Sequence, residues 1–224
     1  MTDYYSNSLS SNRLQKCYEI APTRVKQYLE AEITFVKNKI CQNDIVLDLG
    51  CGYGRVSIRL AENAKQIIGI DTSKNNIQLA GEIAGNNKTL QFYVMNAIDL
   101  KFDDSYFDVV FCVQNGISAF NVDPQRLVQE AIRVTRKGGT VLFSSYSENF
   151  WEERLNWFQI QAEHGLVGEI DYGLTKNGVI VCKDGFKAIT YSGHEFLDLA
   201  SRFNVQTTIH EINNSSVFCE MVVI

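Results

Sequence analysis

The chain has 224 residues, of which 45% are apolar, and these values suit a globular protein with a sizeable core. No run of eighteen apolar residues occurs, and the first residues form no basic and apolar signal region, so we expect neither a membrane span nor export. A formal net charge of −5 without a basic stretch disfavours DNA as a partner. The six cysteines include no Cys-x-x-Cys pair, so we expect a cytoplasmic protein without a metal site or a disulfide framework.

The first predicted element is an amphipathic helix over residues 22–40. Apolar residues recur at helical spacing from Val25 to Ile40, and Pro22 stands near the first turn. A helix with this pattern more often packs on a sheet than takes part in chemistry.

Residues 46–55 are the most informative segment. They read Val-Leu-Asp-Leu-Gly-Cys-Gly-Tyr-Gly-Arg, an apolar strand that contains Asp48 and runs into three glycines spaced two apart. Glycines allow a sharp turn and a close approach by a ligand, and ligands of α/β sheets bind beyond the carboxyl ends of the strands. A dinucleotide fingerprint would need Gly-x-Gly-x-x-Gly. That spacing is absent and Asp48 would repel a pyrophosphate but attract a cationic ligand, so a dinucleotide oxidoreductase is disfavoured.

This segment resembles the first motif of the class I S-adenosylmethionine-dependent methyltransferases, whose loop wraps the amino acid part of the cofactor. The resemblance covers roughly residues 40–145. It implies an α/β fold, a Rossmann-like doubly wound seven-stranded sheet of order 3-2-1-4-5-7-6 whose last strand is antiparallel. Arg55, which follows the loop, either meets the cofactor carboxylate or points to solvent. The resemblance also implies that S-adenosyl-L-methionine is bound by Asp48, Gly50, Cys51, Gly52 and Gly54.

The second strand, over residues 66–70, ends in Asp71, a little over twenty residues after Asp48. An acidic residue at this distance accepts hydrogen bonds from ribose hydroxyls in nucleotide-binding folds. We therefore place Asp71 and the adjacent Thr72 in the cofactor site. Capping of the helix predicted over residues 74–84 is the alternative for Asp71, but Ser73 can cap that helix alone.

The third strand, over residues 90–95, is followed by Asn96 and Ala97. The family usually has Asp-Ala here, with the Asp on the adenine amino group and the next backbone amide on the ring. Asn96 departs from this pattern, yet its carbonyl can accept the same hydrogen bond. An ordinary turn asparagine is the alternative.

The fourth strand, over residues 109–113, is followed by Gln114 and Asn115. By analogy with the family, Gln114 touches the methionine part of the cofactor and Asn115 orients the acceptor. An Asx turn before Gly116 explains Asn115 equally well. The Asn/Asp-Pro-Pro-aromatic motif of amino-group methyltransferases is absent after this strand, which disfavours methylation of nucleic-acid bases.

The last elements complete an alternating pattern. A helix begins at Asp123-Pro124, runs to Arg136 and is closed by Gly138, and Ser192 with Glu195 forms a capping box for a later helix. The turn at residues 213–215 is too short for a helical crossover, so the last two strands must run antiparallel. The remaining predicted ranges are strand 140–146, helix 196–203, and strands 205–211 and 217–223.

Residues 150–191 lie where methyltransferases of this type insert a substrate cover. A helix over residues 152–164 has Trp151, Leu155, Phe158 and Ala162 on one face, and the pair Asn177-Gly178 predicts a hairpin turn between strands 169–174 and 179–182. We expect this cover to close over the methyl donor and exclude water. The chain would then be one methyltransferase domain, 1–224, divided into an N-terminal helix at 22–40, a cofactor-binding core at 41–149, the cover at 150–191, and a final helix and strand pair at 192–224.

No catalytic residue is assigned. A sulfonium methyl group is already activated and in-line displacement depends mainly on positioning, although a His or Tyr could take a proton from the acceptor. By location alone, Tyr172 and Tyr191 are candidates for acceptor binding, and His164 and His194 for the base. Plain packing or a helix start is the alternative for each. The region before the sheet often folds over the donor in small-molecule methyltransferases, and here it carries Tyr4, Tyr5, Tyr18 and Arg24.

The sequence thus predicts methyl transfer from S-adenosyl-L-methionine to a small-molecule acceptor, without DNA or membrane as a partner and with an unassigned oligomeric state. Two alternatives stay open. A protein or RNA methyltransferase of the same fold would show a basic groove. A non-catalytic S-adenosylmethionine-binding module would have its substrate pocket filled by side chains.

Overall fold

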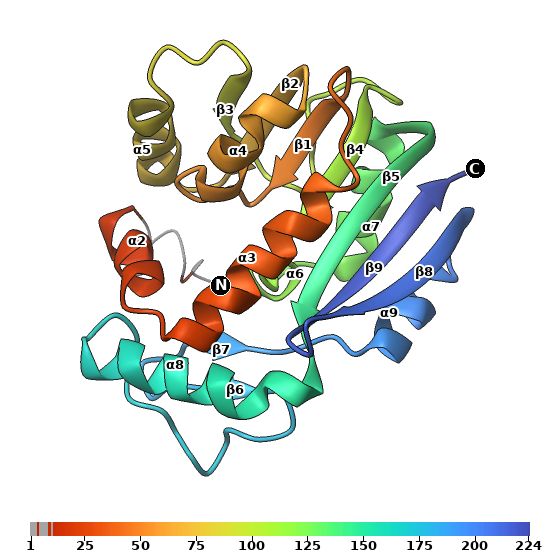
Figure 1. Ribbon diagram of the computed structural model, residues 1–224. Coiled ribbons are helices and arrows are strands. Elements are labelled where there is room, and N and C mark those ends of the chain that lie inside the picture. Colours follow the sequence, from red (N-terminus) through yellow and green to blue (C-terminus); the bar gives the residue numbers. More distant parts are fainter. Residues whose placement is uncertain (1–3, 5–8, 10) are drawn as a thin grey trace.

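The computed structural model describes residues 4, 9 and 11–224, and its centre is a seven-stranded sheet of order β3-β2-β1-β4-β5-β9-β8 (Figure 1). Neighbouring strands from β3 to β5 pair in parallel, whereas β9 is antiparallel to both β5 and β8. This is the predicted order and direction. The strands of the sheet are β1 (Ile45–Leu49), β2 (Gln66–Asp71), β3 (Leu90–Val94), β4 (Phe107–Cys112), β5 (Thr135–Tyr146), β8 (Val205–Ile212) and β9 (Ser216–Val223).

Helices cover both faces of the sheet, and a small second sheet of β6 (Ile180–Val181) and β7 (Lys187–Ala188) lies apart from it. Among the described residues, no helix combines the length and apolar character that crossing a membrane requires. The helices are α2 (Asn12–Glu19), α3 (Thr23–Lys37), α4 (Arg55–Leu60), α5 (Lys74–Ala84), α6 (Gly116–Ala119), α7 (Pro124–Val134), α8 (Trp151–Glu163) and α9 (Gly193–Ala200), with short 3-10 helices at Ala61–Asn63 and Glu148–Phe150.

The two faces have separate apolar cores because side chains alternate along each strand. In β1, Val46 packs in the cluster that contains Ile33 and Val36 of α3, whereas Leu47 packs in the cluster that contains residues of α7 and α9. Figure 1 shows α3 across the first face and α7 behind the second. The central strands are therefore buried on both sides, as a doubly wound parallel sheet requires.

Local signals fixed several element boundaries as predicted. The Ser73 side chain accepts a hydrogen bond from the Asn76 amide at 3.3 Å and caps α5. Ser192 and Glu195 form the reciprocal capping box of α9. Asn213 and Asn214, with φ of 54° and 47°, form the tight turn between β8 and β9.

Several predicted bounds are wrong. The helix predicted over residues 22–40 is α3, which ends at Lys37, and the helix predicted over residues 196–203 is α9, Gly193–Ala200. Helix α7 ends at Val134 rather than Arg136, because the Thr135 hydroxyl bonds the Ala131 carbonyl at 2.7 Å and the chain then continues as β5. Gly138 lies inside this strand with φ of 72°, near an irregular register between β4 and β5. Its left-handed backbone is part of this strand irregularity, and it does not end the helix.

The cover also pairs differently from the prediction. The Asn177-Gly178 turn is present, but only single bridges, Lys176 to Val179 and Ile170 to Cys182, flank it. The strand pair is β6 with β7, joined through the turn at residues 182–186. Figure 1 shows α8 and this pair beyond the C-terminal end of β5.

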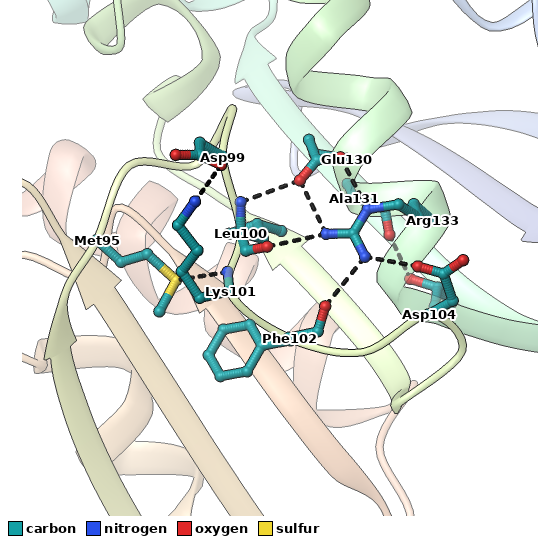
Figure 2. Close-up of polar contacts among 10 residues, drawn as sticks. Met95, Asp99, Leu100, Lys101, Phe102, Asp104, Glu130, Ala131 and Arg133 are labelled. Atoms are coloured by element: carbon teal, nitrogen blue, oxygen red, sulfur yellow. Dashed lines mark hydrogen bonds and ion pairs between the residues drawn. The ribbon is translucent and has the colours of Figure 1, made fainter.

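The connection between β3 and β4 is fixed to α7 by one arginine. Figure 2 shows the Arg133 guanidinium donating to the Leu100 and Phe102 carbonyls at 2.9 and 3.0 Å and to the carboxylates of Glu130 and Asp104. Glu130 in turn accepts the Leu100 amide at 3.0 Å. The segment that follows Asn96 is therefore held in one conformation by α7.

Candidate functional site

A cavity of about 420 Å³ lies at the carboxyl ends of the central strands. This volume lies within the usual range for small-molecule sites. Residues at the ends of β1 to β5 line it, as expected for a parallel sheet. The predicted residues among them are Gly50, Gly52, Asp71, Thr72, Asn96 and Gln114.

The glycine loop between β1 and α4 needs left-handed backbone. Gly50 and Gly52 have φ of 73° and 54°, a region that costs glycine little and other residues much. The amides of Gly50 and Cys51 donate to the Ile70 carbonyl, each at 2.9 Å, which ties the loop to β2. A side chain at Gly52 would also meet Leu14 of α2 at 3.0 Å. The loop thus leaves room for a ligand only when Gly50 and Gly52 are glycine.

Asp48, Cys51 and Arg55 line a smaller cavity of about 50 Å³, which adjoins the larger one at Gly50, Gly52 and Gln114. Asp48 is buried and accepts a hydrogen bond from the Ser57 hydroxyl at 2.6 Å. Burial raises the pKa of Asp48 to about 7, and repulsion by Asp71 adds to the shift. The Arg55 guanidinium stacks on the Tyr18 ring at 4.6 Å, and its buried Nε and Nη2 have no hydrogen-bond partner among the described residues. An anionic group in this cavity would satisfy them.

Asp71 organises the loop and the start of α5. Its Oδ2 accepts the Gly52 amide at 3.0 Å, and its Oδ1 accepts the Ser73 amide at 2.8 Å and the Asn76 side-chain amide at 3.2 Å. The side chain remains half-buried at the wall of the larger cavity. It can therefore hold the loop and face a ligand hydroxyl from one position.

Three predicted residues take more peripheral places. Asn96 is exposed at the rim, where its Oδ1 accepts the Ile98 amide at 3.2 Å in an Asx turn. Ala97 is buried in the core, and its side chain does not line the cavity. Gly54 caps α4 and lines neither cavity; a side chain there would meet the Phe92 ring at 2.9 Å.

Gln114 is held by a buried carboxylate that the sequence analysis missed. Its backbone, with φ of 58°, donates to Glu32 at 2.8 Å and to the Ser144 hydroxyl at 2.9 Å. The Gln114 Oε1 accepts from Tyr18 at 2.8 Å, and its buried Nε2 has no partner among the described residues. Burial raises the pKa of Glu32 to about 7. A carboxylate on the apolar face of α3, one turn after Tyr28, was the signal for this role.

Helix α2 covers the site and was not predicted as a helix. Cys17 and Tyr18 line the larger cavity. The Ser11 amide donates to the Asn76 side chain at 2.6 Å, and Trp157 of α8 donates to the Cys17 carbonyl at 3.0 Å. The helix thus connects the core to the cover. Of the other early residues, Tyr4 bonds Asp184 of the cover at 2.5 Å and Arg24 bonds the Asn213 carbonyl at 2.6 Å, while Tyr5 lies outside the described residues.

The predicted acceptor residues lie away from the cavity. The Asn115 amide donates to the Ile189 carbonyl and accepts from the Ser145 hydroxyl, each at 2.8 Å, and it lines neither cavity. Tyr172 is 62% exposed at the tip of the cover. Tyr191 stacks on Phe196 with ring centroids 5.5 Å apart. The structure therefore does not bring these three side chains together.

The candidate bases are also distant. His164 bonds the Ile160 carbonyl at 2.8 Å at the end of α8, and His194 is exposed at the start of α9. Neither lines the larger cavity, whose only described ionisable wall groups are Asp71, Cys17, Tyr18 and Tyr146. The cover side of the cavity consists of Trp157, Phe158 and Gln161 of α8, beside Tyr146 at the end of β5, and of these four the sequence analysis named only Phe158.

Comparisons with known proteins agree with this arrangement. Residues 47–143 match the family model described as a methyltransferase domain. A ubiquinone biosynthesis O-methyltransferase of Coxiella burnetii is 30% identical over 141 residues, which make up 62% of this chain and 56% of that protein. A 2-methyl-6-phytyl-1,4-hydroquinone methyltransferase of Synechocystis is 29% identical over 149 residues, or 59% of this chain and 46% of that protein. The chain spans about half the length of these curated relatives.

A solved structure extends the likeness in fold beyond the matched segment. A SAM-dependent methyltransferase of Methanosarcina mazei superposes with a TM-score of 0.63 at 23% identity, over 85% of this chain and 97% of that one. The sheet order, the glycine loop after β1 and the match over residues 47–143 agree with one another. Residues 47–143 are thus similar to a methyltransferase domain, and the chain shares the fold of a SAM-dependent methyltransferase.

Proposed function

We propose that the protein transfers a methyl group from S-adenosyl-L-methionine to a small-molecule acceptor. The observation that carries this proposal is the set of three charged groups around the glycine loop. Arg55, with two buried hydrogen-bond donors that have no described partner, and Asp48 line the smaller cavity, and Asp71 lines the larger cavity that adjoins it. A ligand with an anionic, a cationic and a hydroxylated part fits this order.

The residues fit the donor part by part. Arg55 would bind its carboxylate, and Asp48 would face its ammonium and sulfonium groups. Asp71, beside Thr72, would accept the ribose hydroxyls. Asn96 and the Ala97 backbone would meet the adenine. The Nε2 of Gln114, which is buried without a described partner, would donate to the methionine part.

The donor supplies an activated methyl group, and the protein supplies position. The nucleophilic atom of the acceptor forms a bond to the methyl carbon while the carbon–sulfur bond breaks and its electron pair stays on sulfur. A proton carried by that nucleophile goes to water. Alignment alone can contribute about 7 to 11 kcal/mol to such a step. This agrees with a cavity wall in which we find no described histidine.

The two relatives support a small acceptor, since one is an O-methyltransferase of ubiquinone biosynthesis and the other is a hydroquinone methyltransferase. The alternative of a non-catalytic binding module required a filled substrate pocket. A separate cavity of about 520 Å³ beside the donor cavity speaks against it. The alternative of an RNA or protein acceptor required a basic groove, whereas the wall of the donor cavity includes a carboxylate and no described Lys or Arg.

Calorimetric titration with S-adenosylmethionine, S-adenosylhomocysteine and the nicotinamide dinucleotides tests the donor site. We expect binding of the two adenosyl compounds alone. Asp71→Ala should weaken that binding by about 1 to 3 kcal/mol, because a hydrogen-bonded carboxylate is lost. Gly52→Val should abolish it, and Gly81→Val, at an exposed helical glycine with open space around it, should not. Binding of a dinucleotide, or silence with both adenosyl compounds, would refute the proposal.

A further inference from the structure

The cover encloses a second cavity, of about 520 Å³, that the donor assignment does not use. Its walls come from three segments: the end of β5, the first turns of α8, and the two sides of the hairpin. Of its lining residues, Tyr146 alone also lines the donor cavity. The full lining is Tyr146, Ser147, Glu148, Trp151, Arg154, Asn177, Gly178 and Thr190.

Tyr146 is the shared wall between the two cavities. Only 7% of it is exposed, and its ring packs on Tyr28 at 5.1 Å and on Phe150 at 6.2 Å. It ends β5, which pairs with β4 next to Gln114. The two cavities therefore adjoin at Tyr146.

Arg154 builds the floor of the second cavity. It is fully buried, and its Nη1 and Nη2 donate to the Gly178 and Ala188 carbonyls at 2.7 and 3.2 Å, which joins both sides of the hairpin to α8. Its guanidinium lies over the Tyr146 ring at 4.6 Å and within 5.9 Å of the Trp151 ring centroid. These planar groups give the cavity flat inner surfaces.

Apart from Arg154 and the buried Ser147, whose hydroxyl donates to Glu211, the polar side chains of the second cavity are exposed or half-buried. Glu148 and Asn177 are exposed, and the half-buried Thr190 hydroxyl makes only a long contact, 3.4 Å, to the Gly178 carbonyl. Flat aromatic and guanidinium surfaces inside, with hydrogen-bonding groups outside, favour a planar ring with polar substituents over a flexible aliphatic chain. The volume accommodates a ring system of this kind.

We propose that the second cavity is the acceptor subsite and that it binds a planar hydroxylated aromatic compound, with the ring against Trp151 and the stack of Arg154 on Tyr146. This rests on the proposed methyl transfer. The hydroxyl oxygen reaches the donor methyl beside Tyr146, forms the new carbon–oxygen bond as the carbon–sulfur bond breaks toward sulfur, and its proton goes to water. Trp151 then determines specificity for aromatic acceptors without touching the donor.

The two tryptophans allow each cavity to be observed separately, because Trp157 lines the donor cavity and Trp151 lines the second one. In Trp157→Phe saturated with S-adenosylhomocysteine, titration with catechol should change Trp151 emission in a saturable way. The non-aromatic counterpart cyclohexane-1,2-diol should not. In Trp151→Phe, S-adenosylhomocysteine should change Trp157 emission.

A response to S-adenosylhomocysteine with no response of Trp151 to catechol, or an equal response to both diols, would overturn the acceptor subsite alone. If Trp157 does not respond to S-adenosylhomocysteine, the proposed donor site is overturned as well.

Calorimetry of catechol binding to the S-adenosylhomocysteine complex gives a second readout. Trp151→Ala should weaken catechol binding about tenfold, the effect of losing one aromatic contact, and Trp151→Phe should restore most of it. Leu174→Ala, at a cover residue that is 59% exposed and lines no described cavity, should leave catechol binding unchanged. All three variants should bind S-adenosylhomocysteine as the wild type does. Equal catechol affinity in Trp151→Ala and the wild type would refute the role of Trp151.

Discussion

Two buried carboxylates, Asp48 and Glu32, hold the two ends of the proposed donor site in different ways. Asp48 lies under the glycine loop beside Arg55, and Glu32 holds the Gln114 backbone from α3. Burial raises the pKa of each to about 7, so that both can change charge near neutral pH. The charge of the first should affect ligand binding, and that of the second should affect stability.

Donor binding should depend on the ionisation of Asp48. The cationic donor stabilises the charged carboxylate, so binding lowers the pKa of Asp48 from about 7. Affinity for S-adenosylmethionine should therefore rise with pH through this range and be about tenfold weaker at pH 6 than at pH 8. Calorimetry in buffers of different ionisation enthalpy should show proton release on binding at pH 6. Asp48→Asn should bind weakly at both pH values, and a pH dependence retained in that variant would assign the effect to another group.

The raised pKa of Glu32 should make stability fall with pH. The folded state keeps a proton that the unfolded state loses from about pH 4.5, so folding stability decreases as pH rises toward about 7 and then stays level. Glu32→Gln removes this decline. When the pH is raised from 5 to 8, the free energy of unfolding of Glu32→Gln should increase relative to that of the wild type by on the order of 3 kcal/mol. Urea unfolding at the two pH values measures this change.

The neighbour Glu30 supplies the control for this prediction. It is exposed on the same helix and bonds Arg59, which lowers the pKa of its carboxyl group. Its contribution to stability is lost only as pH falls through that lowered value, so Glu30→Gln should differ from the wild type by the same amount at pH 5 and pH 8. Parallel pH curves for Glu32→Gln and the wild type would contradict the role assigned to Glu32.

At the scale of elements, the sequence predicted what short-range signals determine. The bounds of α5 agree with the prediction, because Ser73 caps its start and Gly85 follows its end. The glycine loop was recognised because its left-handed backbone demands its residue types. Helix α2 was missed, since Ser11 gives it no side-chain cap and its contacts are with Asn76 and Trp157, far along the chain.

The cavity walls could be predicted at the strand ends and not in the cover for the same reason. Asp71 and Gln114 follow strand ends, and their place depends only on the order of the sheet. The Asn115 amide is occupied by Ile189 and Ser145, which adjoin it only in the folded chain. In the sequence Arg154 resembles an ordinary exposed polar residue of a helix, whereas in the structure it is fully buried under the hairpin. Contacts of this kind depend on tertiary packing and leave no local pattern.

Helix α2 should slow donor release through Tyr18. Its hydroxyl bonds Gln114 at 2.8 Å, while its ring supports Arg55. Tyr18→Phe keeps the ring and removes the hydrogen bond, so affinity for S-adenosylhomocysteine should fall by about 0.5 to 1.5 kcal/mol, mainly in the dissociation rate. Stopped-flow measurement of release checks this. Tyr93→Phe removes an exposed hydroxyl that bonds Gln91 on β3 and should release the ligand at the wild-type rate. Equal release rates in both variants would show that α2 does not retain the donor.

For the whole molecule, Arg133 links the β3–β4 connection to α7 through two carbonyls and two carboxylates (Figure 2). Arg133→Ala should lower the free energy of unfolding by about 2 kcal/mol, because several charge-assisted hydrogen bonds are lost together. Urea unfolding provides the measurement. Arg136→Ala, which breaks an ion pair to Asp108 on a half-exposed side chain, should cost less than about 1 kcal/mol. If both variants lose a similar amount of unfolding free energy, the contacts of Arg133 in Figure 2 stabilise the protein no more than a single surface ion pair does.

The two ends of the cover segment lie close together in the fold. The Ser145 hydroxyl, next to the end of β5, bonds both the Asn115 side chain and the Tyr191 amide, so the chain leaves the sheet and returns to it beside the same residue. A segment whose two ends meet can change in length and content with little demand on its host. Recombination could therefore graft a different cover onto this sheet and change the proposed acceptor, while the proposed donor site is inherited unchanged.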